Sequence, residues 1–69
     1  MPVFIRSQDR ESLVMINSTI YLVPHLDGER VRIACGSDDL GDYESKERAI
    51  EVLDLIQENN CYIYDMPKE

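Results

Sequence analysis

Short apolar runs separated by polar residues occupy the first third of the chain. They cover residues 3–5, 13–16 and 19–23. Short apolar runs bounded by polar residues predict β-strands. Because both alternating faces of each run are apolar, we expect these strands to lie at the centre of a sheet or to be covered on both sides. Pro24 has no N–H to donate to a ladder, so it predicts a strand end or edge.

Asp27 and Gly28 give the clearest turn signal in this part of the chain. Both tolerate the positive φ that a type I′ hairpin turn requires. The strand that follows has apolar side chains at alternate positions: Val31, Ile33 and Cys35. This alternation predicts a half-buried strand with Arg30 and Arg32 on its open face. A further turn then leads to a short last strand over residues 40–43.

Residues 45 to about 59 predict an α-helix. Ser45 is a good N-cap, and Glu47 lies in the first turn, where the helix dipole favours an anion. One apolar stripe recurs at helical spacing: Ala49, Val52, Leu53 and Ile56. Ile50 and Leu55 flank that stripe on opposite sides and widen it. We expect this helix to lie against the sheet.

These elements together predict an α+β fold formed by a single domain over residues 1–69. An antiparallel β-meander of about five strands packs against one C-terminal α-helix. The tail, residues 61–66, can add a short edge strand, which Pro67 ends.

The length of the chain limits its core. A domain of 69 residues buries only about 60% of the surface that its unfolded chain exposes, so we expect a homo-oligomer. Cys35 and Cys61 show no paired spacing, and the start of the chain does not resemble a signal peptide. We therefore expect a cytoplasmic protein with reduced thiols.

Charge divides the chain into two halves. Residues 1–35 carry equal numbers of acidic and basic side chains, whereas residues 36–69 carry ten acidic and three basic ones, which accounts for the net charge of −7. Nucleic acids and anionic membranes are bound through Lys and Arg, so this distribution argues against both as direct partners.

No set of residues indicates catalysis, a cofactor or a metal, and we expect a protein that is not an enzyme. His25 is the only histidine, and the two cysteines are far from it and from each other in sequence, so one chain lacks a standard zinc set. A cluster of carboxylates follows the fourth strand: Asp38, Asp39, Asp42 and Glu44. Its spacing does not fit an EF-type calcium loop, and we interpret it as a solvated turn.

Two surfaces are candidates for binding. One is an acidic helix face opposite the apolar stripe, which we call the acidic row: Glu47, Glu51, Asp54 and Glu58. It is either a solvated face or a surface matched to a basic partner. The other is the polar turn that we call the 6–10 loop: Arg6, Ser7, Gln8, Asp9 and Arg10. It either caps its own backbone or binds a phosphate or nucleotide, with Arg30 and Arg32 extending it.

Three stretches resemble a widespread family of small uncharacterised proteins from Gram-positive bacteria and their phages. They are IRSQD with SLV at residues 5–14, LGDYES with ERAIEVLD and IQ at residues 40–57, and the ending YDMP at residues 64–67. The resemblance leaves residues 21–35 poorly matched. It supports the fold and a bacterial or phage source, and it implies no catalytic residues.

Two functions follow as hypotheses. The first is a small acidic interaction protein, encoded by a phage or prophage, that inhibits or modulates a bacterial partner with a basic surface, such as a component of a defence system. The second is an oligomeric small-molecule binder that sequesters a nucleotide signal through the 6–10 loop.

Overall fold

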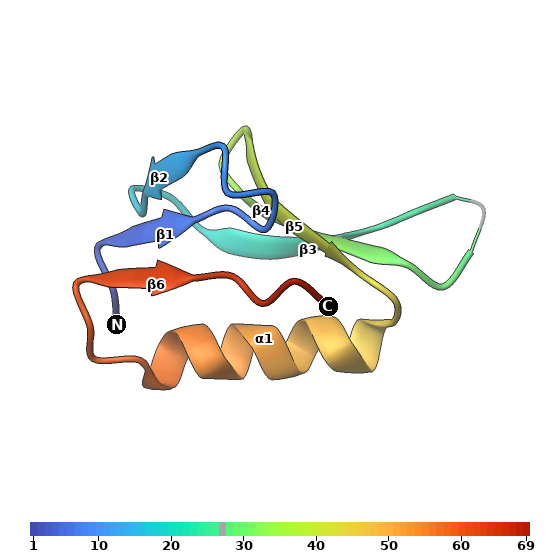
Figure 1. Cartoon of the computed structure of the whole chain (residues 1–69). Coiled ribbons are helices and arrows are strands. Elements are labelled where there is room, and N and C mark those ends of the chain that lie inside the picture. The colour runs from blue at the N-terminus through green and yellow to red at the C-terminus, as the bar shows by residue number, and fades with distance from the viewer. Residues whose placement is uncertain (27) are drawn as a thin grey trace.

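The computed structural model describes residues 1–26 and 28–69 and contains six strands and one helix (Figure 1). The strands are β1 (Phe4–Arg6), β2 (Leu13–Met15), β3 (Ile20–Pro24), β4 (Val31–Cys35), β5 (Asp38–Tyr43) and β6 (Ile63–Asp65). The helix α1 (Lys46–Glu58) lies between β5 and β6 in the chain. The predicted α+β class is confirmed. The turn predicted at Asp27 and Gly28 falls between β3 and β4 in the sequence, and Asp27 lies outside the described residues.

The strands form two three-stranded sheets. One has the order β2-β1-β6 and the other the order β3-β4-β5. The second sheet is an antiparallel meander, as predicted. In the first sheet, β1 pairs antiparallel with β2 and parallel with β6. The predicted tail strand thus exists, and it joins the N-terminal strand, which is far from it in sequence.

The two-sheet arrangement places β2 and β3 at sheet edges. The expectation that these apolar runs are central is wrong for both, because among the strands of the described residues only β1 and β4 have a partner on each side. Some of their large side chains are consequently exposed: Leu13, Met15 and Tyr21. Each edge strand buries only one face, and the residues on that face, such as Val14, are apolar for this reason.

Pro24 ends β3, as its missing N–H predicts. The flanking ladder bonds run from Gly36 N to Thr19 O and from His25 N to Arg30 O. Because hydrogen-bonded pairs alternate along an antiparallel ladder, Pro24 faces the free edge of the sheet rather than β4. Its ring therefore removes no bond from the meander and blocks the edge to further strands.

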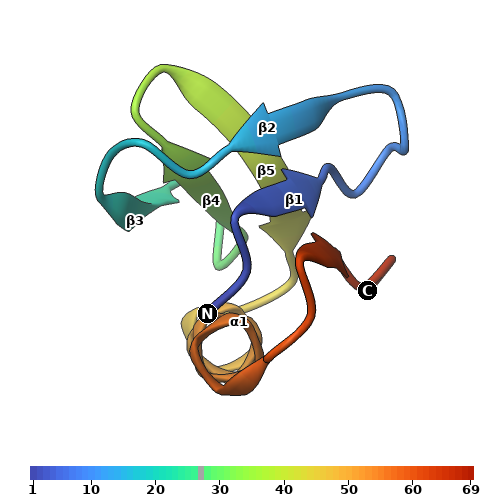
Figure 2. The ribbon, with the colours of Figure 1, turned by 90° about the vertical axis from the view of Figure 1, so that its left-hand side faces the viewer.

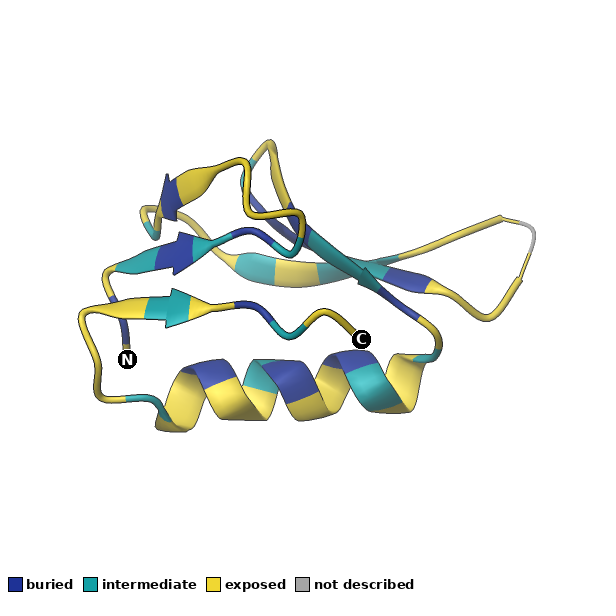
Figure 3. Ribbon diagram, in the orientation of Figure 1, coloured by how far each residue is buried: buried dark blue, intermediate teal, exposed yellow. Residues whose placement is uncertain are grey.

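The helix lies along one side of the two sheets and packs against β4 and β5 (Figure 2). Its buried residues are Ala49, Val52 and Ile56. The buried bands of the helix lie on the side toward the sheets (Figure 3). Leu53 is half-buried, whereas Ile50 and Leu55 are 42% and 43% exposed, so they widen the stripe less than expected. The Ser45 hydroxyl accepts a hydrogen bond from Arg48 N at 3.1 Å, which confirms the predicted N-cap.

Gln8 joins the two sheets and the C-terminal segment. Its side chain donates to Asp42 O (2.9 Å) and Lys68 O (2.8 Å) and accepts from Asp42 N (2.8 Å). The register of β4 and β5 shifts at a β-bulge. Leu40 is the extra residue there, and its carbonyl accepts from Gln8 N at 2.8 Å. Gly41 permits this approach, since an added Cβ would lie 3.1 Å from Gln8 Cβ.

Replacing Gln8 with Ala is expected to lower the free energy of unfolding by about 2–3 kcal/mol. The change removes three hydrogen bonds worth about 1 kcal/mol each and leaves a part-buried backbone amide without its partner. Urea denaturation measures the loss. Gln57→Ala, on the exposed side of α1, is the control and should change stability by no more than about 0.5 kcal/mol. Equal effects of the two substitutions would contradict the bridging role of Gln8.

Candidate functional site

The acidic row lies on the solvent side of α1. All four carboxylates are exposed, and they lie opposite the buried stripe of Ala49, Val52 and Ile56. At 1.5 Å of rise per residue, the row from Glu47 to Glu58 is about 16 Å long. The exposure is as expected and leaves the carboxylates accessible to a partner or water, although Glu51 also pairs with Arg48 at 3.7 Å.

Ile50 and Leu55 border the acidic row. At about 100° of rotation per residue, each lies about 40° from the nearest acidic position, Ile50 beside Asp54 and Leu55 beside Glu51. The exposed face of α1 therefore has a charged centre between two apolar side chains. Reasoning from the sequence assigned both residues to the buried side, and only the angle at which the helix packs reveals their exposure.

The helix also has two cations. Arg48 donates from Nε and Nη2 to Glu69 O at 2.9 and 2.6 Å, and its Nη1 lies 3.7 Å from the Glu51 carboxylate. This arginine is thus turned toward the C-terminal segment. Lys46 lies at the first helical position and is exposed. Neither cation lies within the acidic row, so the row keeps its negative character.

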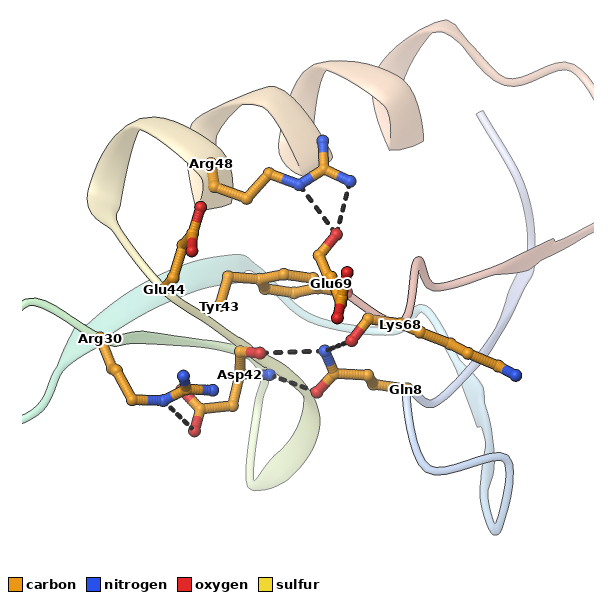
Figure 4. Close-up of a pocket in the computed structure, with 8 residues that line it drawn as sticks. All are labelled: Gln8, Arg30, Asp42, Tyr43, Glu44, Arg48, Lys68 and Glu69. Atoms are coloured by element: carbon orange, nitrogen blue, oxygen red, sulfur yellow. Dashed lines mark hydrogen bonds and ion pairs between the residues drawn. The ribbon is translucent and has the colours of Figure 1, made fainter.

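Beside the start of α1, a pocket of about 560 Å³ opens between β5 and the C-terminal segment (Figure 4). Its lining includes Arg30, Asp42, Tyr43, Arg48 and Lys68. Positive and negative groups alternate around it, and several pair with one another. This mixture does not select an anion or a cation.

Asp42 holds the β3–β4 hairpin to β5. Its carboxylate accepts from Arg30 Nε at 3.2 Å and lies 3.1 Å from His25 Nε2. Asp39 forms a similar pair with Arg32, whose Nε lies 3.2 Å away, although the angle is too poor for a hydrogen bond. The interpretation of this carboxylate cluster as a solvated turn is therefore incomplete. Three of its members lie in β5, and two of these, Asp39 and Asp42, pair with basic groups from neighbouring segments.

The 6–10 loop satisfies many of its own polar groups. Ser7 Oγ donates to Asp9 Oδ1 at 2.5 Å and accepts from Ser12 N, and Asp9 also accepts from Glu11 N. The hydrogen bond from Ser7, followed by that from Glu11, lowers the pKa of the Asp9 carboxyl. The alternative in which the loop caps its own backbone is thus the arrangement that its contacts favour.

The two arginines of the loop lie near Asp65, which is the register partner of Arg6 in the β1–β6 pair. Arg6 Nη1 donates weakly to Arg10 O at 3.5 Å, and Arg10 pairs with Asp65 at 3.8 Å. Beside the loop, Ser7, Gln8 and Asp9 line a shallow pocket of about 270 Å³ together with His25 and Arg32. The sheets therefore bring Arg32 to the loop, as the nucleotide hypothesis requires, while Arg30 belongs to the pocket near α1.

The cysteines do not lie together. Cys35 is buried and its thiol donates toward Ser18 O at 3.7 Å, whereas Cys61 is exposed. Within residues 1–26 and 28–69, no group of three His, Cys, Asp or Glu side chains is placed to hold a metal ion. In the same part of the chain, no helix has the length and apolar character needed to cross a membrane.

Tyr43, at the base of the larger pocket, is expected to make stability fall at alkaline pH. Burial is the main cause that raises its pKa to about 12, and its hydroxyl donates to Pro67 O at 2.7 Å. In the unfolded chain the pKa of tyrosine is about 10. Between about pH 10 and 12 the unfolded state therefore loses its proton while the folded state keeps it, so the folded state loses stability as pH rises.

Tyr43→Phe should be less stable than the wild type by about 1 kcal/mol at neutral pH, because one hydrogen bond is lost. Above about pH 10 the difference should narrow, since the variant lacks this ionisation. Urea midpoints measured from pH 7 to 12 check both statements. Burial also raises the pKa of Tyr64, but Tyr64 is present in both proteins and its effect cancels. A constant difference over the whole range would show that Tyr43 does not cause the decline.

Compared with protein-family models, with curated proteins and with solved structures, the chain matches none of them. Exposure, charge and hydrogen bonding of the residues described above support the proposals that follow.

Proposed function

We propose that this protein is a small interaction protein that binds a basic surface on a bacterial protein and inhibits or modulates that partner. The binding surface is the acidic row of α1 with Ile50 and Leu55 at its borders. The observation that carries the proposal is the exposure of four carboxylates on one helix face between two exposed apolar side chains. The family resemblance implies a bacterial or phage source; we propose a phage or prophage as the source and the cytoplasm as the place of action.

Two physical effects favour this surface. The net charge of −7 is concentrated in the half of the chain that contains α1, and a concentrated field speeds encounter with a basic partner. Charge alone gives selectivity and rate more than affinity. Ile50 and Leu55, at the borders of the row, supply apolar area that a partner can bury.

A basic surface that normally binds DNA or RNA is the kind of partner that fits best. The acidic row presents carboxylates at intervals of about 4.5–6 Å along the helix axis, over a total length of about 16 Å. Such a row can occupy a groove lined by Lys and Arg and compete with the phosphates that the groove binds. A component of a bacterial defence system that acts on nucleic acid has such a surface. The protein would then inhibit by occupation, with no catalytic step of its own.

Reversing two charges of the acidic row should strongly weaken partner binding. In Glu51→Lys/Asp54→Lys the net charge moves from −7 to −3, and the centre of the row becomes repulsive to a basic surface. We expect affinity to fall about tenfold or more at physiological ionic strength. The test uses wild-type and variant protein as baits in host lysate, followed by calorimetry with the purified partner.

The matched control is Glu11→Lys/Glu29→Lys, which changes the net charge equally at exposed sites outside α1. This variant should retain most of the affinity. Unchanged binding by the α1 variant would remove the acidic row from the function. Equal losses in both variants would mean that only total charge matters.

A nucleotide binder is the second candidate, and the observation that favours it is the pocket of about 270 Å³ where Arg32 and His25 meet the 6–10 loop. Against it, Asp39 and Asp42 pair with these basic groups. If a nucleotide binds there, a concentration of 100 times its Kd should stabilise the fold by about 2.7 kcal/mol. Thermal unfolding with a nucleotide panel measures this, with Arg32→Gln as the control that should lose the shift. Unchanged melting with every nucleotide would rule against this candidate.

A further inference from the structure

The edge of β2 has backbone groups that none of the described strands pairs. The hydrogen bonds flanking the β1–β2 pair run from Ser7 N to Ser12 O (2.9 Å) and from Ile16 N to Val3 O (2.8 Å). Bonded pairs recur at every second residue of an antiparallel ladder, so Val14 is the bonded residue of β2. The N–H and C=O groups of Leu13 and Met15 therefore point away from β1, toward the free edge.

The side chains at this edge are apolar and exposed. Leu13 is 47% and Met15 is 52% exposed, and both lie on the outer face of the sheet. Phe4 and Ile63 continue the same row as Met15 across β1 and β6. The three residues of β2 include no proline and no charge.

The other described strand edges are protected. Pro24 blocks the free edge of β3. Gln8 N bonds to Leu40 O of β5, and Asp38 and Asp39 place charge on that strand. The edge strand β6 ends in Asp65, which pairs with Arg10. Natural proteins protect an edge with proline, charge or a covering segment. Within the described part of the chain, β2 has none of these.

We infer that β2 pairs antiparallel with β2 of a second copy of this chain, about a twofold axis at Val14. In that register, Leu13 of each copy lies opposite Met15 of the other, and each such pair exchanges both of its N–H···O bonds. The β2-β1-β6 sheet of one copy then joins the same sheet of the other copy to form one continuous sheet. The edge is self-complementary, because the same two apolar residues face one another in both rows.

Charge favours a second copy at this edge. Each chain has a net charge of −7, which opposes self-association through α1. The edge of β2 belongs to the neutral half of the chain, and it lies on the opposite side of the molecule from α1 (Figures 1 and 2). The proposed register places Glu11 opposite Asn17, so no like charges face each other beside the strand.

The contact at β2 is small, which limits the affinity of the dimer. A stable interface buries about 800 Å² on each partner, a large part of the total surface of 4634 Å². One three-residue edge buries less, so the dimer forms at high protein concentration and dissociates on dilution. The dimer leaves the acidic rows of both copies exposed, far from the β2 contact. The inference of this dimer does not depend on the proposed function of α1.

Two double variants test the register. In Leu13→Lys/Met15→Lys, lysines of the two copies face each other in both rows, so the dimer should be lost. In Leu13→Lys/Met15→Glu, each lysine faces a glutamate, so the dimer should persist. Sedimentation equilibrium across micromolar to millimolar concentrations measures both. Circular dichroism checks that each variant is folded, which their exposed outward positions favour.

Hydrogen exchange provides a second measurement on the unmodified protein. The amides of Leu13 and Met15 should become protected as concentration rises, while the Val14 amide, which bonds within the chain, should not change. A wild-type protein that stays monomeric, a Lys/Lys variant that still dimerises, or a Lys/Glu variant that does not would each overturn the inference.

Discussion

The contact between the apolar stripe of α1 and the strands β4 and β5 determines most of what this protein presents to solvent. Ala49, Val52 and Ile56 are almost completely buried there. Burying a Val or Ile side chain contributes about 1.5–3 kcal/mol relative to leaving it exposed, whereas exposed ion pairs contribute at most about 1 kcal/mol. The apolar stripe therefore sets the rotation of the helix. Once that rotation is set, the helical period turns the acidic row outward.

Features that depend on nearby residues could be predicted from the sequence. The helix is one, because Ser45 and the spacing of its apolar stripe act within a few turns. The strand positions and the end of β3 at Pro24 are others. Each depends on a local pattern, and the structure places each within one or two residues of the prediction. The exposure of the acidic row follows for the same reason.

Features that depend on distant pairing could not be predicted in this way. Nothing in the run 61–66 indicates that β6 pairs parallel with β1. The three bonds of Gln8 join residues more than thirty positions apart, and Asp42 meets Arg30 and His25 only after the meander has formed. The sequence does not show which distant basic residue a carboxylate pairs with. Asp42 has no such partner nearby in sequence, so the sequence alone favoured a solvated carboxylate.

The separation of charge along the chain becomes a separation in space. The neutral half forms β1 to β4, with its arginines largely paired to carboxylates, and the acidic half places its row on the helix at the other side of the fold. An apolar edge in a strongly charged region would be kept apart from a second copy by repulsion. In the neutral half the repulsion is weakest, because exposed charges farther away than a Debye length, about 8 Å at physiological salt, are screened. A chain with a net charge of −7 can thus repel its copies through α1 and still associate through β2. Because the acidic row and the β2 edge lie on different sides of the fold, the row stays available to a basic partner in both the monomer and the dimer.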